Sequence, residues 1–201
     1  TALVTDPPSV DLSGEIFLTK ILRKIDRFVI VNAMQRMDGL IVLVKSLAEN
    51  FAPRVPYIVM EGILRQDDIQ KITDPMQNIS TEQRNKFTVM YAGGISSEYG
   101  IELLISAFEL LEEDDYQLWL FGGGPMETCV REAMNNDQRI VFGGVVSNAD
   151  ILTRLRQASI LINPRPTNQA FTLYSFPSKT IEYLVSGRPV LSTRLKGIPP
   201  E

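Results

Sequence analysis

Residues 87–94 read FTVMYAGG, and the same pattern of an apolar run closed by glycines returns as YQLWLFGGG at residues 116–124 and RIVFGG at residues 139–144. Short apolar runs bounded by glycine are typical of buried strands. Two further runs, ILIN at residues 160–163 and PVLST at residues 189–193, complete five predicted strands. We expect the three glycine-rich ends on one rim, where a ligand could approach the backbone closely.

Helical patterns lie between these strands. Residues 98–112 carry apolar side chains at helical spacing, Pro125 suits the first position of a helix, and Ser147 suits an N-cap. A last helix is expected over about residues 177–186, with Gly187 at its C-terminal end. Strands that alternate with helices favour an α/β fold, a Rossmann-like parallel sheet with helices on both faces. Ligands of such sheets bind beyond the carboxyl ends of the strands.

The first part of the chain predicts a second, partial α/β domain. Strands are expected at residues 2–5, 39–44 and 56–60, with a long helix over residues 15–37 and a shorter one after the second strand. This pattern resembles the last third of such a domain. The chain starts at Thr1 rather than Met and stops soon after the fifth strand of the other domain, so we expect it to be cut from a longer protein.

The predicted long helix carries a basic set and an apolar set of side chains. The basic set is Lys20, Arg23, Lys24 and Arg27, and the apolar set is Phe17, Ile21, Ile25 and Phe28. The ordinary interpretation is a solvated charged face over an apolar stripe that packs on the core. The alternative is a helix that rests on an anionic membrane surface.

Composition narrows the classes of function. The net charge of −4 argues against a general nucleic-acid binder, which needs clustered positive charge. The chain has no histidine, which excludes a Ser-His-Asp triad and histidine metal ligands from these residues. Cys129 is the single cysteine, so an internal disulfide is excluded, and a reducing, cytoplasmic location fits. We expect no metal and no cofactor.

Lys179 and Glu182 are the candidate ligand-binding pair. The start of the last predicted helix offers free N–H groups and a partial positive charge, which suit a diphosphate, and Lys179 in its first turn adds a full charge. Glu182 lies three residues on, on the same face, where its carboxylate could accept two hydrogen bonds from a ribose diol. An exposed helical ion pair is the alternative.

The same region resembles a known family. SFPSKTIEYL at residues 175–184 and SGRPV at residues 186–190 are similar to the donor-site signature of GT-B glycosyltransferases, closest to the family 4 type of bacterial capsule and exopolysaccharide synthesis. Five shorter matches are in the family's order, YAGG at 91–94, YGI at 99–101, FGGVV at 142–146, NPR at 163–165 and GIP at 197–199.

The resemblance implies a domain layout. Residues 1–64 would be an incomplete C-terminal portion of the N-terminal, acceptor-side Rossmann-like domain, and residues 65–86 a linker. Residues 87–201 would be the nucleotide-sugar-binding domain, truncated at its end. The chain by itself is therefore expected to be inactive.

The resemblance also implies a function. The enzyme would be a hexosyltransferase that transfers a sugar from a nucleoside-diphosphate sugar to a cell-surface polysaccharide or lipid-linked acceptor. The carrier would most simply be UDP or GDP, and the transfer would proceed with retention and without a metal.

The resemblance further implies a set of site residues. The implied contacts are Gly93, Gly94, Ser178 and Lys179 with the diphosphate, Glu182 with the ribose, Val145, Val146 and Arg165 on the nucleobase side, and Tyr174, Ser175 and Phe176 on the donor-sugar side. No catalytic residue is assigned. The partners would be the donor and a saccharide or lipid-linked acceptor but no nucleic acid, with peripheral contact at the cytoplasmic membrane face as a further expectation.

The sequence departs from the family at three positions. Many relatives carry phosphate-contacting Arg and Lys residues where this chain has Gly94 and Tyr99, and a Glu that touches the donor sugar where it has Tyr174. Two alternatives stay open. One is a sugar-nucleotide 2-epimerase of the same fold, which would also bind a nucleotide sugar, and the other is a non-catalytic nucleotide-sugar-binding subunit, which the three departures favour.

Overall fold

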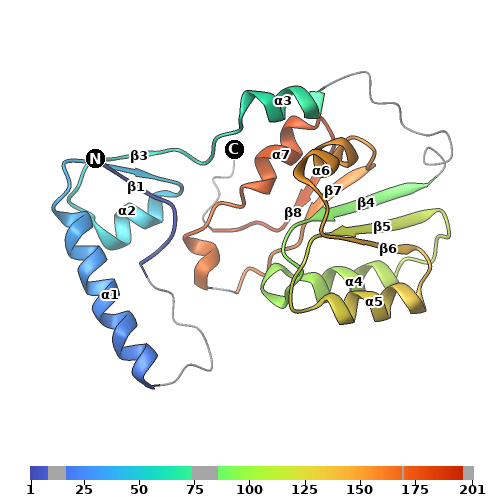
Figure 1. Ribbon diagram of the computed structural model, residues 1–201, viewed down its shortest axis with the longest axis horizontal. Coiled ribbons are helices and arrows are strands. Elements are labelled where there is room, and N and C mark those ends of the chain that lie inside the picture. The colour runs from blue at the N-terminus through green and yellow to red at the C-terminus, as the bar shows by residue number, and fades with distance from the viewer. Residues whose placement is uncertain (9–16, 74–85, 169, 197–201) are drawn as a thin grey trace. The chain divides into compact units, whose positions relative to one another are not determined.

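The computed structural model describes residues 1–8, 17–73, 86–168 and 170–196 (Figure 1). The chain divides into two compact units. The N-terminal unit comprises Thr1–Ile63, Thr167–Phe176 and Arg194–Glu201, and the nucleotide-site unit, named for its predicted role, comprises Leu64–Pro166 and Pro177–Thr193.

The nucleotide-site unit contains a five-stranded sheet of order β6-β5-β4-β7-β8. Its strands are β4 (Phe87–Ala92), β5 (Tyr116–Phe121), β6 (Ile140–Gly144), β7 (Ile160–Asn163) and β8 (Val190–Ser192). All four neighbouring pairs are parallel. The chain adds strands outward from β4 on one side and then returns to add β7 and β8 on the other. The point where this order reverses, between β4 and β7, is where open α/β sheets bind ligands.

Helices cover both faces of this sheet (Figure 1). They are α3 (Gln66–Thr73), α4 (Ile101–Glu109), α5 (Glu127–Asn136), α6 (Asn148–Leu155) and α7 (Lys179–Val185). One core lies under α4 and α5 and contains Ile101, Phe108 and Val130, and the other contains Ile72, Leu152 and Tyr183 from α3, α6 and α7. The Rossmann-like α/β fold predicted from the sequence is thereby confirmed.

Three predicted helix starts need correction. The helix expected over residues 98–112 is a short 3₁₀ helix, η2 (Ser97–Tyr99), followed by α4. Gly100, at φ 78°, separates the two because its left-handed backbone interrupts helical geometry. Helix α5 begins at Glu127, two residues after Pro125, and α7 begins at Lys179 with Ser178 as its N-cap residue.

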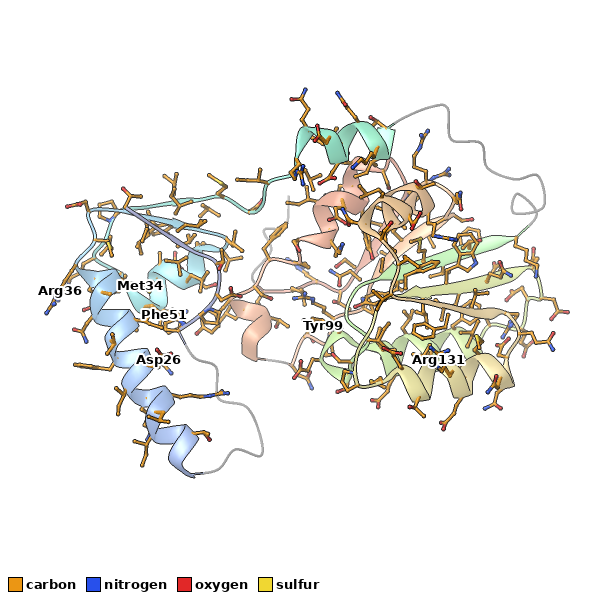
Figure 2. All side chains as sticks on the ribbon, viewed as in Figure 1. Asp26, Met34, Arg36, Phe51, Tyr99 and Arg131 are labelled. Carbon is orange, nitrogen blue, oxygen red and sulfur yellow. The ribbon has the colours of Figure 1, made fainter. Side chains whose placement is uncertain are left out.

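The N-terminal unit contains a three-stranded parallel sheet of order β1-β2-β3. Its elements are β1 (Ala2–Val4), α1 (Phe17–Gln35), β2 (Leu40–Val42), α2 (Lys45–Phe51), β3 (Tyr57–Val59) and η3 (Ala170–Leu173). Met34 from α1 and Phe51 from α2 lie in its core with the buried residues of β2 (Figure 2). These elements agree with the predicted partial α/β domain.

Three segments group differently from the predicted domain layout. One is Arg194–Glu201, which was expected in the domain of residues 87–201 and belongs to the N-terminal unit. Helix α3 occupies the first part of the expected linker and buries Ile72 in a core of the nucleotide-site unit. Residues 167–176 belong to the N-terminal unit, because Tyr174 and Phe176 pack against its core. The predicted boundaries at residues 64/65 and 86/87 stay predictions.

Candidate functional site

A cavity of about 400 Å³ lies at the carboxyl ends of β4, β5 and β6. Its described lining comprises Ala92, Gly93, Gly94, Phe121, Gly122, Gly123, Val145, Val146, Asn148, Ile151 and Lys179. This volume is within the range of small-molecule binding pockets, roughly 300–1,000 Å³. The cavity stands at the rim where the fold and the glycine pattern both predict a ligand.

The loop after β4 is held in place by two aromatic side chains. The Tyr91 hydroxyl donates a hydrogen bond of 2.9 Å to the carbonyl oxygen of Gly94. Burial raises the pKa of Tyr91, so the phenol stays protonated and keeps donating. A Cβ atom on Gly94 would lie 2.6 Å from the ring of Tyr99. The Tyr99 ring therefore occupies the space that a side chain at position 94 would need.

The loops after β4 and β5 touch through their backbones. Gly122 has φ +133°, and a Cβ atom there would lie 1.8 Å from the carbonyl oxygen of Gly93. A Cβ atom on Gly124 would lie 2.2 Å from the carbonyl oxygen of Ile95. The prediction that the glycines admit a ligand is thus incomplete, because Gly122 and Gly124 first of all let one loop pack against the next.

Three donors on this lining could serve an anion. Among the described residues, the backbone amides of Gly94 and Gly123 have no hydrogen-bond acceptor. Lys179 supplies the single charged side chain of the described lining. Val145, on the same lining, is 78% exposed, which leaves its apolar side chain free to cover a ligand. The surroundings therefore favour a ligand with an anionic part and a flat apolar part.

Lys179 and Glu182 form the ion pair that helical spacing predicts. The Lys179 Nζ and Glu182 Oε2 atoms are 3.1 Å apart, and the side chains are 39% and 16% exposed. Of the two, Lys179 lines the cavity, and Glu182 is not part of the described lining. Ser178 is exposed, and its side chain makes no capping hydrogen bond. Lys179 forms the helical ion pair and lines the cavity at the same time. The ion-pair interpretation and the ligand-binding interpretation of these residues therefore do not exclude each other.

Arg165 lies outside the cavity lining. Its guanidinium carbon is 4.9 Å from the centre of the Tyr99 ring, a cation–π contact. Burial lowers the pKa of Arg165. The predicted nucleobase-side group is therefore brought together only in part, since Val145 and Val146 line the cavity and Arg165 stacks on Tyr99 instead.

The predicted donor-sugar residues belong to the N-terminal unit. The rings of Tyr174 and Phe51 have their centres 5.2 Å apart, and Phe176 packs against the same core. Ser175 lies between them in the chain and is half-buried. The role of these three residues stays a prediction. The GIP motif at residues 197–199 lies outside the described residues.

Sequence reasoning missed some lining residues. Asn148 and Ile151 come from the start of α6, where the Ser147 hydroxyl accepts a hydrogen bond of 3.2 Å from the Asp150 amide. The predicted N-cap at Ser147 could have indicated both residues, because a helix that follows a strand starts at the rim where the strand's carboxyl end lies. Ala92 and Phe121 could have been inferred in the same way from the ends of β4 and β5, whereas Gly122 and Gly123 belong to the glycine-rich ends that were expected on this rim.

The described residues contain neither a metal-binding cluster nor a membrane-spanning helix. No group of three or more Cys, Asp or Glu side chains in the described part of the chain could hold a metal ion. None of the described helices is long and apolar enough to cross a membrane.

Comparison with known families decides the assignment. The profile described as "Glycosyl transferases group 1" matches residues 86–201, which is more than half of the chain. The chain belongs to this family. The matched region contains all five strands of the nucleotide-site unit, so the cavity described above is part of a group 1 glycosyl transferase. No curated protein matches the sequence.

Solved structures of glycosyltransferases share the fold of this group 1 member. Anabaena HepE in complex with UDP and glucose has a TM-score of 0.61 at 18% identity over 87% of this chain and 49% of that chain. WaaG, a glycosyltransferase involved in lipopolysaccharide biosynthesis, has a TM-score of 0.66 at 14% identity over 98% of this chain and 60% of that chain. Sucrose-phosphate synthase from Thermosynechococcus elongatus gives 0.61 at 18% identity over 87% and 45%. The chain thus spans 60% or less of the length of these three structures.

The predicted glycosyltransferase family is confirmed at this level. The capsular family 4 type, the domain layout and the roles of single residues stay predictions.

Proposed function

We propose that the protein is a hexosyltransferase that takes its sugar from a nucleoside-diphosphate sugar, with UDP or GDP as the carrier, and binds that carrier in the cavity. The observation that carries this proposal is the lining itself, in which one ammonium, an exposed valine and two backbone amides with no acceptor among the described residues border a space of about 400 Å³. Membership of the group 1 glycosyl transferases and the UDP complex of HepE support it.

Different residues would contact the diphosphate, the base and the ribose of the nucleotide. The Lys179 ammonium and the amides of Gly94 and Gly123 would hold the diphosphate, and the exposed Ser178, which precedes Lys179 in the chain, would add its hydroxyl. Val145 and Val146 would lie along the base. Glu182 would accept hydrogen bonds from the ribose diol with Oε1, the oxygen that is not paired with Lys179.

Lys179 would also assist the transfer step. In that step the bond between the sugar's anomeric carbon and the diphosphate breaks, and the diphosphate leaves with the electron pair. An acceptor hydroxyl oxygen bonds to the carbon, and its proton passes to the departing diphosphate. Negative charge grows on the departing diphosphate, and a cation already in place stabilises it without reorganisation. The proposed outcome is retention of configuration, with a cell-surface polysaccharide or lipid-linked acceptor.

We further propose that α1 contacts an anionic lipid surface at the cytoplasmic face of a membrane. Ile21, Ile25 and Phe28 of the predicted apolar stripe are 40% to 70% exposed, so the expectation that they pack on the core is wrong. Their neighbours Leu22 and Val29 are exposed as well. From α1, Met34 reaches the core and Val31 packs against it. Basic residues, among them Lys24, alternate with the exposed apolar ones, a pattern that suits anionic lipid.

A calorimetric screen of UDP, GDP, ADP and dTDP, with EDTA present, tests the binding proposal. EDTA removes divalent metal ions, and we expect UDP or GDP to release heat of binding without them, because Lys179 and the backbone amides can hold the diphosphate by themselves. Because the 201-residue chain is expected to be inactive by itself, transfer from a radiolabelled donor to lipid or oligosaccharide acceptors by a longer form of the protein tests the reaction. Conversion of the donor to its 2-epimer would instead identify an epimerase, and binding without turnover by a longer form of the protein would identify a binding subunit.

A further inference from the structure

Tyr183 joins helix α7 to the end of strand β4. It follows Glu182 in the chain, and its side chain is 1% exposed. Its phenol oxygen accepts a hydrogen bond of 2.9 Å from the Ala92 amide and donates one of 3.2 Å to the Ala92 carbonyl oxygen. Ala92 is the last residue of β4 and directly precedes Gly93 and Gly94 of the cavity. One side chain therefore connects the helix that carries Lys179 to the base of the glycine loop.

Ala92 needs this partner because its neighbouring strand stops short. Strand β4 pairs with β5 as far as Ala92, but with β7 only at Val89 and Met90. Along a parallel strand, alternate residues direct their N–H and C=O groups to the same neighbour. Thr88 directs both of these groups to Ser159 on the β7 side, so Ala92 faces that side too. Tyr183 takes the place of the missing strand pairing.

A second side-chain bond anchors α7 on the other side of the switch point. The Asn163 side-chain amide donates a hydrogen bond of 3.3 Å to the Thr180 hydroxyl. Asn163 is the last residue of β7 and is 6% exposed. The helix is thus tied to β7 through Thr180 and to β4 through Tyr183, the two strands between which the strand order reverses.

We propose that Tyr183 is a positioning residue of the nucleotide site, which holds Lys179 against the Gly93–Gly94 loop so that the ammonium and the loop amides meet the same diphosphate. The Thr180–Asn163 bond is the second anchor. Tyr183 itself lines no part of the cavity, so it acts through Ala92 and α7. This inference rests on the proposed nucleotide binding. Donors that are fixed before the ligand arrives give the strongest interaction with it.

Tyr183→Phe in the 201-residue chain tests the role. Removal of the hydroxyl is expected to weaken UDP binding about tenfold in calorimetry, because donors to a charged group lose their alignment. Binding of uridine, which lacks the diphosphate, is expected to change much less. In the ligand-free protein, hydrogen exchange at the Ala92 amide is expected to accelerate.

Ser159→Ala is the matched control. The Ser159 hydroxyl accepts a hydrogen bond of 3.0 Å from the Thr88 amide at the opposite end of β4, far along the strand from the cavity. We expect this variant to lose stability but to keep the UDP affinity of the wild type. Thr180→Val, at a half-buried position, removes the second anchor and is expected to weaken UDP in the same direction, whether or not Tyr183→Phe folds.

Three outcomes would overturn the role of Tyr183. The first is an unchanged UDP affinity in Thr180→Val and in a folded Tyr183→Phe. The second is an equal loss of UDP affinity and uridine affinity in Tyr183→Phe. The third is a loss of UDP affinity in Ser159→Ala equal to that in Tyr183→Phe. When the wild type binds UDP, these outcomes reject the positioning role alone. A folded wild type that binds no nucleoside diphosphate rejects both the proposed function and the positioning role.

Discussion

Lys179 and Glu182 share an ion pair of 3.1 Å, yet only the lysine reaches the cavity lining. The Glu182 carboxylate thus pairs with the ammonium through Oε2 and keeps Oε1 for another partner. This arrangement allows the two residues separate roles, a diphosphate contact for Lys179 and a ribose contact for Glu182.

Glu182→Ala is expected to weaken both UDP and uridine by about tenfold or more, because the ribose is common to both and a charged hydrogen bond contributes about 1.5–3 kcal/mol. Calorimetric titration of both ligands measures this. Asp68→Ala is the matched control, since Asp68 forms an i,i+3 pair with Lys71 on α3 and is 18% exposed, against 16% for Glu182. If the two variants bind UDP and uridine as the wild type does, Glu182 has no ribose contact.

Gly122→Ala is expected to destabilise the protein by about 2–6 kcal/mol, the sum of backbone strain and overlap with a fixed neighbour. The neighbour is the carbonyl oxygen of Gly93, at 1.8 Å from the added Cβ atom. Gly187→Ala measures the backbone strain without the overlap, because φ there is +71° and the added Cβ atom meets nothing within 4 Å. Its cost should be about 1–2 kcal/mol. Equal losses in urea unfolding would show that the two loops do not pack as described.

Phe28→Asp is expected to reduce binding of the chain to vesicles that contain anionic lipid, measured by co-sedimentation. Phe28 is 70% exposed on α1, and a buried aliphatic or aromatic side chain contributes about 1.5–3 kcal/mol. Leu110→Asp is the control, because Leu110 is 81% exposed in the other unit. Equal binding to neutral vesicles, loss of binding in the control, or self-association through α1 in place of lipid binding would contradict the membrane proposal.

Stability is expected to fall above pH 10. Burial raises the pKa of Tyr91 and of Tyr183 above the ordinary value of 10.0. The folded state therefore keeps both phenols neutral while the unfolded chain ionises, and the stabilisation that is complete below pH 10 is lost as the pH rises further. The loss is about 1.4 kcal/mol per pH unit for each phenol. Urea unfolding at pH 9 and pH 11 should show a smaller drop in Tyr183→Phe than in the wild type, and an equal drop would refute this assignment.

The sequence predicted those features that depend on local pattern. Apolar runs, three of them closed by glycines, located the five strands, and helical spacing put Lys179 beside Glu182. The cap at Ser147 was predicted because a hydroxyl before a helix satisfies a local amide. These features follow from neighbours in the chain, so they are readable without a structure.

Features that depend on distant partners were not predictable. Nothing near Gly94 indicates that the Tyr99 ring fills its side-chain space, and nothing near Tyr174 indicates that it packs on Phe51. Arg165 was assigned to the nucleobase side, but its guanidinium makes a cation–π contact with the Tyr99 ring. The bond from Tyr183 to Ala92 depends on where β7 stops pairing with β4, which is a property of the folded sheet.

The most direct test of the nucleotide site is the UDP affinity of Lys179→Ala relative to its uridine affinity. Lys179 is the one charged side chain of the described cavity lining, so its loss should weaken UDP by about tenfold or more and leave uridine nearly unchanged. Lys71→Ala, which removes the lysine of the comparable pair on α3, should bind both ligands as the wild type does. Equal effects of Lys179→Ala on UDP and uridine, or no effect on UDP, would contradict the assignment of this cavity to the nucleoside diphosphate.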